Sequence, residues 1–205
     1  MTKHKMHRKM LLAMAVVFAL PACGLPTEPV RLMITPVRAD DAADQMGQAD
    51  LLAAFESTIY PNGMIAFDFI NGQNIETDMD VTLPGQGRAG YAQVLHISNM
   101  AELKADDEAI FSAAFCTNTV YPIFLEGDWP LFIEEDGKLF FNTQAGAGIG
   151  EAPDFAGAKV VSTSADAFEI EVAMIGPGSD VGIPFTYRMV KQNGYWVLDN
   201  FYFWQ

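Results

Sequence analysis

The alternation of apolar and polar residues in the C-terminal half constrains the fold more than any other feature. Between Phe168 and Ile175, every second residue is a large apolar one, and Glu169 and Glu171 stand between them. Side chains of a β-strand point alternately to the two faces of its sheet. A period of two with charges on one side therefore predicts an antiparallel sheet that buries one face and exposes the other.

Two dipeptides that favour tight turns predict β-hairpins in the same half. Asp136-Gly137 stands between the apolar runs 132–133 and 139–142, and Asn193-Gly194 precedes the run 195–204. Asp, Asn and Gly tolerate the positive φ angles that two-residue hairpin turns require. The last run is apolar or aromatic on both faces, which predicts a central strand or one covered by helices.

The N-terminal half of the domain favours helices. Asp50 is placed to cap a helix whose apolar residues recur every three to four positions, and Pro61-Asn62-Gly63 is expected to end that helix. Asn99 and Glu102 have the spacing of a capping box, so a second helix is expected from Met100 to about Phe115.

Three consecutive acids, Asp106 to Glu108, interrupt the second helix and are candidates to cap a separate helical segment after it. The resulting order along the chain is helices first and antiparallel strands afterwards. This order predicts an α+β fold in which N-terminal helices pack on a curved antiparallel sheet.

The first residues have the pattern of an export signal. A basic head precedes the apolar run from Leu11 to Leu20, which is too short to span a membrane but suits a signal-peptide core. The following Pro21-Ala22-Cys23 completes a segment that resembles a bacterial lipobox. Residues 1–22 are thus expected to be a signal peptide and Cys23 a lipidation site. The alternative is an ordinary cleaved signal that releases a soluble protein. Both place the domain outside the cytoplasm, and with the lipid anchor it is expected in the cell envelope, facing the periplasm or the exterior.

The remaining chain divides into a tether and a domain. Residues 23–48 contain prolines and acids without periodicity, which is typical of a flexible tether, and residues 49–205 are expected to form one domain. Four of the 12 basic residues precede Cys23, so eight remain against 26 acidic residues, a net charge of about −18. Such a charge argues against nucleic acid and against membrane contact other than the lipid anchor. It favours a cationic partner or a divalent ion, although acidity also serves solubility.

No residue pattern indicates catalysis. After Cys23 the chain has one cysteine, Cys116, and one histidine, His96. Cys116 lies in an apolar helix end and His96 between two apolar strand residues, which favours structural roles over a Cys-His nucleophile pair. We therefore expect no catalytic residue and no cofactor, and the cysteine count excludes a disulfide framework.

An acidic segment raises the question of calcium. Glu76, Asp78 and Asp80 alternate, so in a strand they share one face, and three converging carboxylates are able to hold calcium. The segment lacks the spacing of a calcium-binding loop. A hydrated strand face is the preferred interpretation, and no metal site is expected.

From Tyr91 to Phe203 the chain resembles the secreted DL-endopeptidase inhibitor family, which restrains cell-wall autolysins. The resemblance rests on the helix Ala101–Lys104, on Glu135–Phe140, on the Gly-rich loop after it and on the closing Asn193–Phe201. These are turns, core aromatics and a hairpin. The resemblance implies a cystatin-like or NTF2-like fold, with a peptidoglycan hydrolase as the partner. The chain departs from the family in its lipobox and tether.

Acidic and aromatic loops form the predicted contact surface, because aromatics are enriched in the centres of interfaces and acids steer cationic partners. The expected function is a non-catalytic, acidic binding domain that inhibits or regulates a cell-wall hydrolase. The alternative is a small-ligand-binding domain of the envelope, with an apolar cavity between helix and sheet. The predicted contact residues are Asp128, Trp129, Glu134, Glu135, Asp136 and Gly148.

Overall fold

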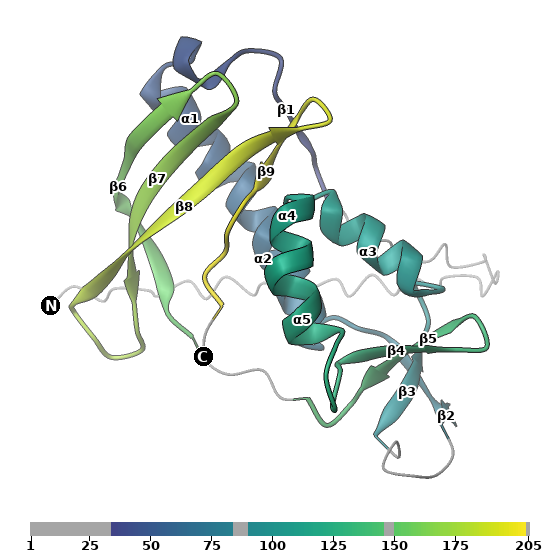
Figure 1. Cartoon of the computed structure of the whole chain (residues 1–205). Helices are drawn as coiled ribbons and strands as arrows, with labels where there is room; N and C mark the ends of the chain where they lie inside the picture. The colour runs from purple at the N-terminus through teal and green to yellow at the C-terminus, as the bar shows by residue number, and fades with distance from the viewer. Residues whose placement is uncertain (1–33, 84–89, 146–149, 204–205) are drawn as a thin grey trace, which may run out of the picture.

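The structure is a computed structural model that describes residues 34–83, 90–145 and 150–203, and its strands form two antiparallel sheets (Figure 1). The larger sheet consists, in spatial order, of β1 (Val37–Arg38), β9 (Tyr195–Leu198), β8 (Gly182–Gln192), β7 (Ala167–Ile175) and β6 (Ala152–Ser164). The smaller sheet consists of β2 (Thr77–Thr82), β3 (Tyr91–Val94), β5 (Lys138–Asn142) and β4 (Phe132–Glu135).

Two long helical segments each enclose a π-helix. The first segment is α1 (Gln48–Ala54), η2 (Phe55–Ile59) and α2 (Tyr60–Ile70). The second is α4 (Ala113–Phe115), η3 (Cys116–Val120) and α5 (Tyr121–Phe124). The other helices are the 3-10 helix η1 (Ala43–Gln45) and α3 (Met100–Glu108). The first segment lies along the larger sheet, and both segments run toward the smaller sheet (Figure 1).

The predicted α+β class is confirmed, with N-terminal helices packed on a curved antiparallel sheet. The alternation in β7 is present as expected, because its inward residues from Phe168 to Met174 are buried and share one core with Leu51 and Phe55 of the first helical segment. The periodicity of two therefore identified the face that the helices cover.

Both predicted hairpin turns are present. Asp136 and Gly137 have φ angles of 53° and 71° between β4 and β5, and Asn193 and Gly194 have 53° and 81° between β8 and β9. These positive values are what two-residue hairpins with the strand twist require. As predicted for its apolar faces, β9 has a neighbour on each side, β1 and β8.

The last strand is shorter than the apolar run 195–204 indicated. β9 ends at Leu198, and the side chain of Asn200 then takes over the contact with β8. Asn200 Oδ1 accepts from the backbone N–H of Arg188 at 2.7 Å, and its Nδ2 donates to the carbonyl of Thr186 at 2.8 Å. An amide side chain thus replaces the backbone ladder for one step, and Phe201 can turn into the core.

The folded region begins before Ala49, so the end of the predicted tether needs correction. Within the described part of that range, β1 pairs with β9, and Ala39 and Ala43 are buried. The amide of Asn62 donates to the carbonyl of Thr35 at 2.9 Å. Residues 34–48 therefore complete the larger sheet. The expected signal peptide and Cys23 lie outside the described residues.

The first helical segment does not end at Pro61-Asn62-Gly63, contrary to the prediction. Proline lacks an N–H, so it leaves one helical hydrogen bond unmade. Here a π-turn precedes the proline, and the N–H of Tyr60 donates to the carbonyl of Phe55, five residues back. The second segment has the same device, with Tyr121 donating to Cys116 ahead of Pro122. The wider turn allows both helices to continue past a proline.

The two segments also share sequence. Thr58-Ile59-Tyr60-Pro61 in the first matches Thr119-Val120-Tyr121-Pro122 in the second. Each segment is followed by a pair of antiparallel strands, β2 with β3 and β4 with β5, and β3 pairs with β5 at the middle of the smaller sheet. The smaller sheet is therefore built from two similar helix-plus-strand-pair units arranged about its central strand pair.

The break after α3 is present, but its acids do not cap the next helix. Asn99 caps α3, and its Oδ1 accepts from the N–H of Glu102 at 2.9 Å, as the capping box predicted. Asp106 to Glu108 instead lie at the C-terminal end of α3. The cap of the second helical segment is Ser112, whose hydroxyl accepts from the N–H of Phe115.

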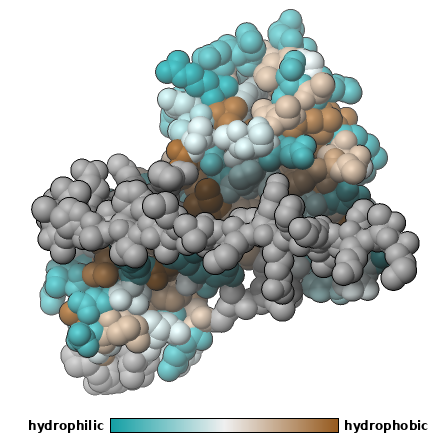
Figure 2. All heavy atoms as spheres, turned by 180° about the vertical axis from the view of Figure 1, so that it is seen from behind, coloured by the Kyte–Doolittle hydropathy of each residue, from teal (hydrophilic) through white to brown (hydrophobic). Residues whose placement is uncertain are grey.

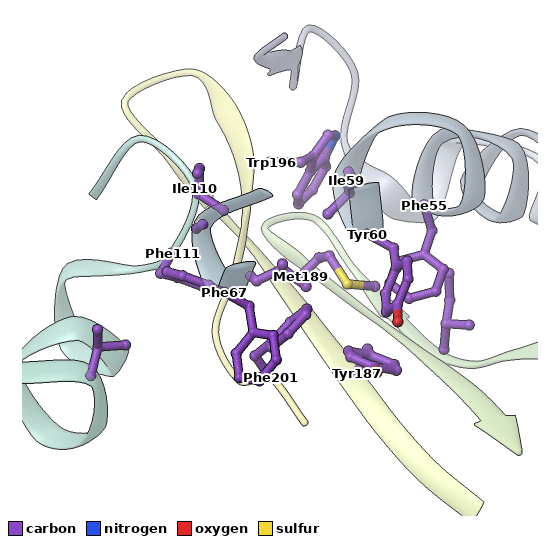
Figure 3. Packing of buried hydrophobic residues seen from close by; sticks show 14 of the residues in the cluster. Phe55, Ile59, Tyr60, Phe67, Ile110, Phe111, Tyr187, Met189, Trp196 and Phe201 are labelled. Carbon is purple, nitrogen blue, oxygen red and sulfur yellow. The ribbon is translucent and has the colours of Figure 1, made fainter. Parts of the chain in front are cut away.

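Aromatic rings fill the contact between the first helical segment and the larger sheet (Figure 3). Tyr187 on β8 lies at the centre, with its ring centroid 5.1 Å from Phe55, 5.7 Å from Tyr60 and 5.9 Å from Phe201. Aromatic pairs at such separations contribute about 0.5–1.5 kcal/mol each beyond the burial of their area. Side chains therefore fill the space between this helical segment and the larger sheet, where the alternative function places a ligand cavity.

Gly63 allows α2 to approach the end of the chain closely. A methyl group at this position would lie 2.5 Å from the Phe201 ring and 2.7 Å from the Leu198 side chain. Replacing a helical glycine by alanine normally favours the helix by about 1 kcal/mol. We expect the opposite sign for Gly63→Ala, a loss of about 1–3 kcal/mol of unfolding free energy, because the buried rings must move.

Urea unfolding of the two proteins measures this difference. Gly157→Ala is the matched control, because the nearest atom to its new methyl group is a carboxylate oxygen of Asp154 at 3.9 Å. The control should stay within about 0.5 kcal/mol of the parent chain. A more stable Gly63→Ala protein would contradict the close contact.

Candidate functional site

The most prominent exposed aromatic residue lies between α5 and β4, in the segment Leu125–Pro130, called here the Trp129 loop. The side chain of Trp129 is 68% exposed, and Glu126, Gly127 and Asp128 are exposed beside it. Gly127 has a φ angle of 89°, which gives the loop its sharp bend. The sequence placed a tryptophan and an acid in a loop here, and the structure places both at the surface.

The base of the Trp129 loop is fixed. The N–H of Leu131 donates to the carbonyl of Phe124 at 2.7 Å, which closes the loop. The hydroxyl of Tyr91, on β3, donates to the carbonyl of Pro130. A loop held at both ends presents its side chains with little loss of conformational freedom on binding, which favours affinity.

Ile123 adds a second apolar side chain on the helix from which the Trp129 loop departs. It is 55% exposed, although its neighbours Tyr121 and Phe124 are buried. Sequence reasoning missed Ile123, because an isoleucine within an apolar helical run is ordinarily expected in the core. Only its phase relative to the buried residues of α5 distinguishes it.

The predicted acidic residues of the β4–β5 hairpin do not join this loop. The strand β4 separates them from Trp129, since Glu135 ends the strand and Asp136 forms the turn beyond it. Glu134 also has a structural role, because its Oε2 accepts from the N–H of Met100 at 2.8 Å, at the start of α3. Gly148 lies outside the described residues.

The carboxylates of the larger sheet form ion pairs, whereas those of the Trp129 loop do not within the described residues. On the outer face of the larger sheet, Glu171 pairs with Lys159 at 2.6 Å, and Glu169 pairs with Arg188 at 3.3 Å. Within the described ranges, Glu126 and Asp128 of the loop form no ion pair. Their charge therefore remains available to a partner, whereas the sheet carboxylates are compensated.

Hydrophobic residues are distributed in separate areas of the surface. In Figure 2, hydrophilic residues cover much of the coloured surface, and smaller hydrophobic areas lie among them. Among the residues that the structure describes, the large exposed apolar ones other than Ile123 and Trp129 are Met79, Leu95, Val161, Val181 and Ile183.

Cys116 and His96 do not form an open nucleophilic site. Cys116 is fully buried in η3 and free of any disulfide. Nε2 of His96 lies 2.7 Å from Oε2 of Glu76, so the imidazole contacts an exposed carboxylate and not the thiol. A thiol that solvent and substrate do not reach is unsuited to nucleophilic catalysis.

The acidic strand segment does not gather its carboxylates either. Oδ1 of Asp78 accepts from the N–H of Asp80 at 3.0 Å, so it serves the local backbone, while Glu76 is engaged with His96. Across residues 34–83, 90–145 and 150–203, no group of three or more His, Cys, Asp or Glu side chains is placed to hold a metal ion.

A buried polar cluster lies where α3 meets the second helical segment. The hydroxyl of Tyr121 donates to Oε1 of Glu108 at 3.0 Å. Burial, together with the nearby Asp107, raises the pKa of the Cys116 thiol to about 12. Burial and the neighbouring Asp106 and Glu108 raise the pKa of Asp107 to about 8. At neutral pH, Cys116 is therefore a thiol and Asp107 is protonated.

The raised pKa of Asp107 makes folding stability depend on pH. Between the ordinary pKa of 3.8 and about 8, the folded state holds a proton on Asp107 that the unfolded chain has released. The free energy of unfolding should therefore fall as pH rises through this window, by at most about 1.4 kcal/mol per pH unit. Well below pH 3.8 both states hold the proton, so the stabilisation is complete there and no longer changes with pH.

Asp107→Asn should remove this part of the pH dependence, because the amide stays neutral. Urea unfolding at pH 5, 6.5 and 8 compares the slopes of the two proteins. Asp128→Asn, at an exposed position, is the control and should retain the parent slope. Equal slopes for Asp107→Asn and the parent chain would show that Asp107 is ionised in the folded state.

No protein-family model and no curated protein sequence matches the chain. In the described ranges, none of the helices has the length and apolar content needed to cross a membrane.

Proposed function

We propose that this protein is an exported, acidic, non-catalytic binding domain whose Trp129 loop contacts a cationic partner in the cell envelope. The observation that carries the proposal is the exposed Trp129 on a loop fixed at its base. A large, rigid aromatic side chain supplies contact area at low entropic cost, and such residues dominate the energetics of interfaces.

The charge of the loop supports a cationic partner. Glu126 and Asp128 precede the tryptophan in the loop, and the chain after Cys23 carries eight basic against 26 acidic residues. Complementary charge accelerates association and selects among partners. The resemblance to DL-endopeptidase inhibitors makes a basic cell-wall hydrolase the first partner to test, with the domain acting as its inhibitor or regulator.

The location follows from the N-terminal sequence. We propose that the export signal ends at Cys23 and that this cysteine carries a lipid anchor, so the domain acts at a membrane surface. Labelling of cells with a fatty-acid analogue should mark the parent chain and leave Cys23→Ala unmarked. A parent chain without label would contradict the anchor, and the domain would then be released as a soluble protein. Labelling that persists in Cys23→Ala would place the acyl group on another residue and contradict the assignment of Cys23.

The Trp129 loop makes a direct prediction for binding to a purified cationic DL-endopeptidase. Trp129→Ala should weaken binding by about 2 kcal/mol or more, which is roughly thirtyfold, because a central aromatic contact is lost. Affinity should also fall as salt concentration rises, since the charged groups are at the surface. Calorimetric titration at low and high salt measures both effects.

Ile183→Ala is the matched control, because Ile183 is 57% exposed on β8 of the larger sheet, apart from the loop. It should leave the affinity unchanged. A parent chain that binds no envelope hydrolase, or one in which the two substitutions weaken binding equally, would contradict the proposed role of the loop.

A further inference from the structure

A cleft of about 400 Å³ lies between α3 and the β8–β9 hairpin. Three parts of the chain that are distant in sequence form its walls: the C-terminal half of α3, the hairpin turn and Pro36 just before β1. Figure 1 shows the end of α3 close to the hairpin and to the start of β1. The Trp129 loop is not part of this cleft.

The floor of the cleft is apolar and leaves room for a ligand. Val197 of β9 lines it and is only 3% exposed. Ala105 of α3 and Ala109, the residue that caps the C-terminal end of α3, also line it, and their spacing of four residues places them on one side of the helix. Their methyl groups are short, so the helix and the hairpin do not fill the space between them.

The walls are held in place by hydrogen bonds. Nε2 of Gln192 donates to the carbonyl of Glu108 at 3.2 Å, and its Oε1 accepts from the N–H of Ala113 at 3.0 Å. The N–H of Leu198 donates to the carbonyl of Ile110 at 2.9 Å. These bonds join the end of α3 to β8 and β9, so the cleft is preformed.

Glu108 is the acidic residue of the lining. Glu108 accepts a hydrogen bond from the hydroxyl of Tyr121 at 3.0 Å, which fixes the side chain and uses one of its oxygens. A carboxylate offers about four acceptor positions, so Glu108 retains capacity for a further donor. The ammonium nitrogen Nζ of Lys104, one turn earlier on α3, lies 4.6 Å from the centre of the Tyr121 ring.

The remaining lining groups match the shape of an alkylammonium ion. Tyr195 is the aromatic residue of the lining, and it lies on the same face of β9 as Val197, two residues further on. An alkyl chain gains from contact with alanine and valine side chains, and an ammonium group gains from a carboxylate and from an aromatic face. The cleft combines these groups within one small volume.

We propose that this cleft binds a primary amine carried on an alkyl chain, such as a lysine side chain, with the ammonium group at Glu108 and the methylene groups over Val197. This site is independent of the Trp129 loop and of the partner proposed for it.

The test is a nuclear magnetic resonance titration of the full chain at low salt with Nα-acetyl-lysine amide. Saturable shifts are expected at the amides of Ala105, Ala109 and Val197. Nα-acetyl-norleucine amide has the same alkyl chain without the ammonium group. Its affinity should be lower by roughly tenfold or more. Equal binding of the two probes would overturn the proposed amine specificity.

Glu108→Gln should weaken the lysine probe by roughly tenfold, because it removes the charge and keeps an oxygen that accepts from Tyr121. Glu126→Gln removes the same charge from the Trp129 loop and should have no effect. An unchanged affinity in Glu108→Gln, or an equal loss in both variants, would overturn the role of Glu108.

A second pair of variants tests the location without touching the carboxylate. Ala109→Leu fills the cleft and should abolish saturable binding, whereas Ala101→Leu, two turns earlier at an exposed position of α3, should not. Thermal melting checks that each variant is folded. Undiminished binding to folded Ala109→Leu, or no saturable shift in the parent chain, would overturn the site.

Discussion

The close contact between α2 and the chain after β9 is the constraint on which the rest of the structure depends. Gly63 leaves no side chain between the helix backbone and the rings of the core, so Phe201 packs against Tyr60 and Tyr187. The end of β9 is joined through Leu198 to Ile110, just after α3, and the following chain is joined to β8 through Asn200. This close contact thereby fixes α2, the larger sheet and the β9 wall of the cleft beside α3 relative to one another.

Local signals in the sequence predicted those parts of the fold that local chemistry decides. The alternation in β7, the turn at Asn193-Gly194 and the cap at Asn99 each act over a few residues, and each is present. The prediction that the first helix ends at Pro61 was wrong, because a π-turn just before the proline compensates for its missing N–H. The strand at Val37 was missed, since a two-residue edge strand has no detectable period.

In the candidate sites, too, the sequence indicated what local chemistry decides and missed what depends on tertiary packing. Composition and neighbours indicated that Trp129 lies in a loop, whereas its exposure depends on the tertiary structure around it. Glu134 was predicted as a contact residue, and the structure adds a structural role that the sequence did not indicate, since Glu134 accepts from the backbone at the start of α3, which is distant in sequence. The cleft at Glu108 could not be predicted, because its walls come together only when α3 and the β8–β9 hairpin pack.

The π-turns have a geometric consequence for the helices that contain them. Each closes one residue more than an α-turn, so it takes up one extra residue of sequence. Leu51 before the first turn and Ala66 after it both belong to the core of the larger sheet. An extra residue in a regular α-helix would rotate one half against the other by about 100°, and the wide turn avoids that rotation. Removing one residue between Phe55 and Ile59 would therefore restore an ordinary helix and leave Leu51 facing the sheet.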